Sequence, residues 1–116
     1  MLEPAPALVA GVHEAAWLTV DGEVVRLPHK EAARRLAKGG PIYLLHAPAT
    51  VTRISGRAGG RIPTGSLDLL ELFAFVAPAK FCVPTPRGLA EALQLPIPGG
   101  LEDQAILLPR AAQRLL

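Results

Sequence analysis

Twelve prolines and eleven glycines are spread along this 116-residue chain, and they limit the length of every helix and strand. Proline removes a backbone donor and fixes φ, while glycine weakens the interior of a helix or a strand. We therefore expect short elements rather than a long helical bundle. The length allows one domain, residues 1–116. Aromatic residues make up only 4% of the chain, so leucine, alanine and valine must fill the core.

The first half of the chain predicts a helix among strands. Asp21-Gly22 indicates a tight hairpin turn, because glycine accepts a positive φ without steric cost. Residues 29–38 carry alanines and Leu36 on one side and charges on the other, which predicts an amphipathic helix ending at Gly39-Gly40. A helix between strands favours an α/β fold with a small mixed sheet of about four strands and flanking helices. The apolar runs place these strands at 7–12, 16–20, 23–27 and 42–45.

The stretch 47–65 is rich in glycine and proline and predicts a long irregular connection, with one helical turn near 49–54. Ser66 is then expected to cap a helix that ends at Pro78, with Asp68 near its positive end.

Two more helices are expected towards the end of the chain. Thr85-Pro86 indicates a helix start, because proline at the first helical position loses only an N–H that is unpaired anyway. This helix should reach about Gln94. The last helix is expected over 101–116, bent or broken at Pro109.

Residues 68–96 combine an acid-led helix, a proline-rich turn, a second capped helix and a Leu-Pro stop. Its segments LFAF, FCVPTPRGLA and ALQLP resemble the N-terminal part of bacterial DinG-type ATP-dependent DNA helicases, and the wider pattern over 42–116 is similar to DnaQ-like (DEDD) exonuclease domains. The resemblance implies a degenerate ribonuclease H-like/DnaQ-like exonuclease fold. It also implies a role in DNA repair, with the chain as the N-terminal piece of a longer helicase whose core would be its partner.

Active members of the DEDD group hold two divalent metal ions with acidic side chains. These acids come from three motifs, of which the first reads Asp-x-Glu and the second His-Asn-x-x-Phe-Asp. Residues 12–15, which match the first motif, keep only Glu14. The stretch that matches the second keeps His46 without the Asn and Asp that should follow it. In the third, Gly99 stands for the general base and Gln104 for the metal-binding Asp, beside Asp103. The resemblance therefore implies a vestigial cleft at Glu14, His46 and Asp103, with no catalytic residue and no metal ligand.

The glycine-rich stretch 56–61 lacks the Gly-Lys-Ser/Thr that holds phosphates and Mg²⁺ in P-loop proteins. We therefore expect no cofactor in this chain. ATP and Mg²⁺ would belong to the helicase part of the parent protein.

Basic residues are gathered in two places, although the formal net charge is only +2. Either group can contact phosphates, which predicts weak, non-specific DNA binding; the alternative is a solvated helix face and a flexible loop. The first group would form a stripe on one helix face: Lys30, Arg34 and Lys38. The second lies in and next to the glycine-rich stretch: Arg53, Arg57 and Arg61.

The favoured function is a non-catalytic, exonuclease-like module of an ATP-dependent DNA helicase with a DNA-guiding or docking role. Two alternatives stay open: a stand-alone protein-interaction domain without a nucleic-acid role, and a divergent metal-dependent 3′–5′ exonuclease.

The N-terminal apolar stretch has no basic region before it, no run is long enough to span a membrane, and the single cysteine, Cys82, excludes an internal disulfide. These features predict a cytoplasmic protein with no membrane partner.

Overall fold

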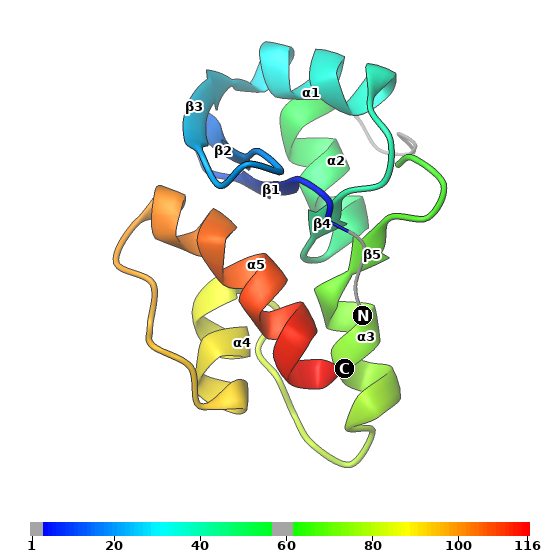
Figure 1. Cartoon of the computed structure of the whole chain (residues 1–116), viewed down its shortest axis with the longest axis vertical. Helices are drawn as coiled ribbons and strands as arrows, with labels where there is room; N and C mark the ends of the chain where they lie inside the picture. The colour runs from blue at the N-terminus through cyan, green and yellow to red at the C-terminus, as the bar shows by residue number, and fades with distance from the viewer. Residues whose placement is uncertain (1–3, 57–61) are drawn as a thin grey trace.

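The structure is a computed structural model, and it describes residues 4–56 and 62–116. The chain forms a five-stranded mixed sheet with helices on both faces (Figure 1). The strands follow the order β3-β2-β1-β4-β5 across the sheet. They are β1 Ala7–Ala10, β2 Glu14–Leu18, β3 Val24–Pro28, β4 Tyr43–Leu44 and β5 Leu67–Asp68. The helices are α1 His29–Lys38, α2 Ala47–Ser55, α3 Leu69–Val76, α4 Pro86–Leu93 and α5 Leu101–Leu115.

Strands β1, β2 and β3 are antiparallel neighbours, and β4 pairs in parallel with both β1 and β5. The turn between β2 and β3 forms where Asp21-Gly22 predicts it. The Gly22 N–H donates to the Thr19 carbonyl over 3.0 Å, and Gly22 itself has a φ of +95°. A three-residue hairpin loop ends in such a glycine because the bulge requires a left-handed backbone.

Alternating side chains of the sheet bury two separate cores, since successive residues of a strand point to opposite faces. In β1, Leu8 belongs to the core under α1 and α2, whereas Ala7 and Val9 belong to the core under α3, α4 and α5. In β2, Trp17 lies on the α1–α2 face, where the Arg35 guanidinium stands 5.7 Å from the centre of its ring. Figure 1 shows the result as three layers, with the sheet between α1–α2 and α4–α5.

Two local predictions around residue 66 are wrong. Leu67–Asp68 is a fifth strand, and Asp68, not Ser66, caps α3 by accepting a hydrogen bond from the Leu70 N–H. The Ser66 hydroxyl instead accepts from the Ile42 N–H over 3.0 Å, which joins the entrance of β4 to that of β5. A two-residue strand has no alternation that a sequence pattern can reveal.

Two helices are longer or more continuous than expected. The stretch expected to be irregular contains the nine-residue helix α2, which ends at Ser55 and is capped by Gly56 with a φ of +78°. Helix α5 continues through Pro109 from Leu101 to Leu115. Tertiary packing holds α5 at this position, because Leu108 and Ala112 on either side of Pro109 are fully buried.

Gly88 in α4 is a position where a methyl group should be damaging. Alanine normally stabilises a helix by about 1 kcal/mol relative to glycine. Here a Cβ would lie 2.3 Å from the Val83 carbonyl oxygen and 2.6 Å from the Val83 Cβ. We therefore expect Gly88→Ala to lower the free energy of unfolding by about 2 kcal/mol in urea denaturation, as for an overpacked core.

Gly40→Ala is the matched control, because a Cβ there would meet no atom within 4 Å. It should change the free energy of unfolding by less than about 0.5 kcal/mol. A Gly88→Ala protein as stable as the wild type would show that α4 does not pack on the preceding loop.

Candidate functional site

A cavity of about 410 Å³ opens at the carboxyl end of β1. Five parts of the fold bound it: the end of β1 and the turn after it, the link between β4 and α2, one side of α2, the start of α4 and the first turn of α5. The volume lies within the range of small-molecule sites in proteins. Its walls are formed by Leu8, Val9, Ala10, Gly11, Val12, Leu45, His46, Ala49, Thr50, Arg53, Pro84, Thr85, Pro86, Leu101 and Gln104.

Four lining side chains supply most of the polar groups of this cavity: His46, Arg53, Thr85 and Gln104. Among the residues that the structure describes, no aspartate or glutamate lines the cavity. The guanidinium of Arg53 gives the lining a permanent positive charge. Its polar side chains come from α2, α4 and α5 and from the link between β4 and α2, so only the tertiary fold brings them together.

His46 reaches the cavity through an unusual backbone conformation. Its φ and ψ are 56° and 70°, in the left-handed region that L-residues other than glycine rarely adopt. The ring caps α2, because Nδ1 accepts a hydrogen bond from the Ala49 N–H over 3.3 Å. An imidazole nitrogen that accepts carries no hydrogen, so Nε2 carries it and is a donor.

The buried carboxylate of Asp68 holds His46 in this conformation. Asp68 Oδ1 accepts from the His46 N–H over 2.9 Å, and Oδ2 accepts from the Ala47 N–H over 2.7 Å. With its bond from the Leu70 N–H, Asp68 joins the starts of α2 and α3. The sequence interpretation assigned Asp68 only to the helix dipole. Asp68 directly precedes the apolar run of the helix, and an acidic residue at that position is a signal for a helix cap.

Three carbonyl groups of lining residues already accept hydrogen bonds from the protein. Arg53 Nη1 donates to the Ala10 carbonyl over 2.9 Å, and His29 Nε2 donates to the Gly11 carbonyl over 2.8 Å. The Thr50 hydroxyl donates to the Leu45 carbonyl over 2.9 Å. These three carbonyl oxygens of the wall are therefore compensated by donors of the protein.

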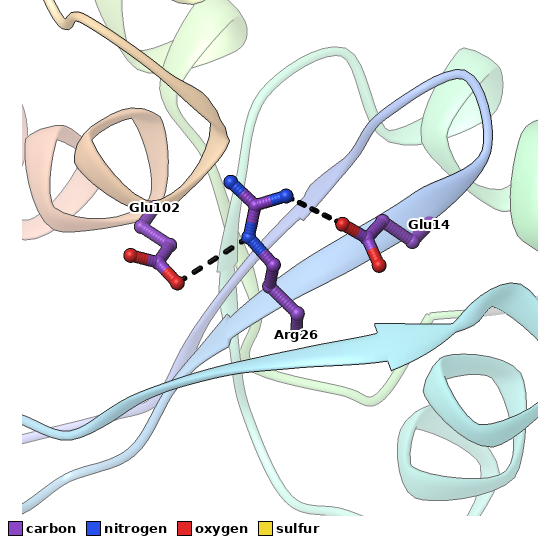
Figure 2. Close-up of polar contacts among 3 residues, drawn as sticks. All are labelled: Glu14, Arg26 and Glu102. Atoms are coloured by element: carbon purple, nitrogen blue, oxygen red, sulfur yellow. Dashed lines mark hydrogen bonds and ion pairs between the residues drawn. The ribbon is translucent and has the colours of Figure 1, made fainter.

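Glu14 lies at the start of β2 and does not line the cavity. Figure 2 shows it on one side of the Arg26 guanidinium, with Glu102 of α5 on the other. Arg26 Nη1 donates to Glu14 over 2.6 Å, and Arg26 Nε donates to Glu102 over 3.3 Å. The hydrogen bonds to Glu14 and then to Glu102 raise the pKa of Arg26. All three side chains are solvent-exposed, where ion pairs contribute little to stability.

Asp103 is also absent from the lining of this cavity. It borders a second hollow of about 270 Å³, formed with the 95–98 segment and with Arg110 of α5. Its Oδ2 accepts from the Gly99 N–H over 3.3 Å. Of the three residues expected at a vestigial cleft, the structure therefore places only His46 at the cavity. The place expected for the first motif falls after β1, which ends at Ala10.

The basic stripe of α1 forms as the spacing predicts. Lys30, Arg34 and Lys38 are all exposed on one helix. Arg34 donates to Glu31 over 2.6 Å, so part of its charge is compensated. In the second basic group, Arg53 lies at the cavity, while Arg57 and Arg61 fall outside the described residues.

Cys82 packs half-buried against the core beside α3, α4 and α5, as a small apolar residue would. Burial raises the pKa of its thiol and so disfavours the reactive thiolate.

Within residues 4–56 and 62–116, no cluster of three or more His, Cys, Asp or Glu side chains is placed to hold a metal ion. None of the described helices is long and apolar enough to cross a membrane.

Comparisons with family models, with curated proteins and with solved structures found no match for this chain. The fold and the cavity define an α/β domain with a five-stranded mixed sheet and a donor-lined hollow at the end of its central strand.

Proposed function

We propose that this chain is a non-catalytic module with a degenerate ribonuclease H-like/DnaQ-like fold, which guides or docks DNA next to the core of an ATP-dependent helicase. The observation that carries the proposal is the sheet. The antiparallel β1–β2–β3 unit, with β4 and β5 added in parallel beyond β1 and helices on both faces, supports an α/β fold of this kind.

The cavity supports the non-catalytic part of the proposal. It lies at the end of the central strand, where the resemblance places the metal centre of active relatives. Its wall carries Gln104 and Arg53 where a two-metal site needs carboxylates. A neutral amide or a cation cannot replace an anionic oxygen on Mg²⁺, so the cavity is unsuited to metal-assisted phosphodiester cleavage.

The basic stripe of α1 supports the DNA-guiding part. Lys30, Arg34 and Lys38 stand on the exposed side of α1, while Ala32 and Leu36 bury its other side in the core. Contacts of cations with phosphates carry no sequence information, and they weaken as salt rises because binding releases counterions. We therefore expect non-specific binding with a dissociation constant no tighter than about micromolar at physiological salt.

The test is fluorescence anisotropy of a labelled oligonucleotide over a salt series, with Mg²⁺ present. Changing Lys30, Arg34 and Lys38 together to glutamate should abolish binding, and the oligonucleotide should stay intact throughout. The matched control reverses Arg87, Arg110 and Arg114, three exposed cations on α4 and α5. Both triple variants change the formal net charge equally, so only loss of the α1 stripe should remove binding.

Equal binding by both variants, or no binding even at low salt, would contradict the DNA-guiding role. Metal-dependent release of nucleotides that follows the purified protein would contradict the non-catalytic role.

A specific surface feature favours the second candidate function, a protein-interaction domain. Phe75 at the end of α3 and Phe81 in the loop before α4 are 85% and 83% exposed. Val76 and Val83 beside them are also exposed. All four lie between residues 75 and 83 of the chain, and an exposed apolar patch is typical of surfaces that bind other proteins. Absence of DNA binding in the anisotropy experiment would make this function the better one.

A further inference from the structure

We propose that the cavity at the end of β1 binds a phosphate monoester directly, without a metal ion. This site is separate from the basic stripe of α1, and the proposal goes beyond the DNA-guiding function. The ligand is defined by its chemistry: a compact dianion bearing several acceptor oxygens. It can be a free phosphorylated metabolite or the terminal phosphate of a nucleic-acid strand.

The charge of the lining is the first argument. Arg53 contributes a permanent positive charge, and no carboxylate lines the described cavity to oppose an anion. Arg53 Nη1 donates to the Ala10 carbonyl, and the guanidinium has two further donor nitrogens, Nε and Nη2, for a ligand. Hydrogen bonds from a guanidinium to phosphate are among the strong, charge-assisted ones.

The other polar side chains add donors. His46 presents Nε2–H, because its Nδ1 accepts from the Ala49 N–H. Thr85 Oγ1 accepts from the Gly88 N–H over 3.0 Å, so its hydroxyl hydrogen can be donated to a ligand. Gln104 adds an amide group from α5. Guanidinium, imidazole, hydroxyl and amide groups together match the several oxygens of a phosphate.

The wall carbonyls are the second argument, because unpaired carbonyl oxygens would repel an anion. Those of Ala10, Gly11 and Leu45 are paired with Arg53, His29 and Thr50. At Gly11 a Cβ would lie 2.7 Å from the Glu14 carbonyl oxygen, so a side chain is not tolerated in this wall. These three wall carbonyls are thus compensated, and Gly11 leaves the volume of the cavity open.

Backbone strain is the third argument. His46 holds a left-handed conformation, which is strained in a residue with a Cβ, and such residues gather at binding sites. Asp68 maintains this conformation through the His46 and Ala47 N–H groups. The strain places an imidazole donor in the cavity wall.

The experiment is a titration of ¹⁵N-labelled protein with inorganic phosphate and with a nucleoside 5′-monophosphate, followed by NMR chemical shifts. Shift changes are expected at His46, Thr85 and Gln104. Arg53→Gln should weaken binding at least about tenfold, since it removes the charge-assisted donors. Gln104→Glu preserves the side-chain shape and should weaken binding by about the same factor, because it places a like charge beside the ligand.

Lys38→Gln is the control, because it removes an exposed cation of α1 and should change the affinity less than about twofold. Melting curves of all variants verify that each is folded. A second arm compares oligonucleotides with and without a 5′-phosphate. Tighter binding of the phosphorylated strand identifies a nucleic-acid end, whereas binding of the mononucleotide alone identifies a metabolite.

Shift changes confined to α1, or affinities unchanged in both Arg53→Gln and Gln104→Glu, would overturn the proposal. No shift change with any phosphate probe would overturn it as well. None of these results bears on DNA binding by the α1 stripe, which the triple charge reversal tests separately.

Discussion

Replacing Asp68 with alanine is expected to lower the free energy of unfolding by about 3–5 kcal/mol, the largest effect of any single polar substitution proposed for this chain. The carboxylate is only 6% exposed and accepts hydrogen bonds from the backbone N–H groups of His46, Ala47 and Leu70. Alanine would leave these donors without their partner, and each unpaired buried donor costs about 1–3 kcal/mol. Urea denaturation followed by circular dichroism measures the loss.

Two matched variants make this result specific. Asp68→Asn keeps one acceptor oxygen and should lose about half as much stability as Asp68→Ala. Asp103→Ala removes an exposed aspartate that accepts one hydrogen bond in the first turn of α5, and it should cost less than about 1 kcal/mol. If Asp68→Ala is no more destabilising than Asp103→Ala, Asp68 does not join the starts of α2 and α3.

Leu108→Ala is expected to lower the free energy of unfolding by about 3–4 kcal/mol. Leu108 is fully buried where α5 packs on the sheet, in the same core as Val9 of β1 and Leu18 of β2. Truncation removes apolar contacts and leaves a cavity that surrounding residues only partly fill. A domain of this size is stable by about 5–15 kcal/mol, so the variant should remain folded but melt at a lower temperature.

Leu116→Ala is the control for this substitution. Leu116 is 68% exposed at the end of the chain, so its truncation should change the free energy of unfolding by less than about 0.5 kcal/mol. A Leu108→Ala protein that loses less than about 1 kcal/mol would be inconsistent with a core beneath α5.

Sequence patterns located the elements whose signals are local. The helix expected at 29–38 is α1, with the bounds His29–Lys38, because its apolar period and the Gly-Gly stop both lie within the element. Thr85 caps α4 and Pro86 is its first residue, as a cap followed by proline predicts. The hairpin at Gly22 and the mixed sheet also follow from local patterns.

The elements that were missed depend on partners distant in the sequence. Strand β5 has two residues, and it exists because Leu67 and Asp68 pair with Tyr43 and Leu44 of β4. Helix α2 starts where a buried carboxylate 21 residues further along the chain accepts the Ala47 N–H. Helix α5 passes Pro109 because its apolar side is buried against the sheet. In each case the stabilising contact is tertiary, so a pattern within one segment cannot report it.

The candidate site divides in the same way. The residue types around His46 and Gln104 already indicated, from the sequence alone, that carboxylates are missing from the expected metal positions. Only the tertiary structure separated His46 from Glu14 and Asp103, because Glu14 pairs with Arg26 on the sheet surface and Asp103 lies at a different hollow. The same structure placed Arg53 at the cavity, since its guanidinium reaches the Ala10 carbonyl across 43 residues of chain. Composition along the chain determines which charges exist, whereas the packing of α2 and α5 on the sheet decides which of them meet.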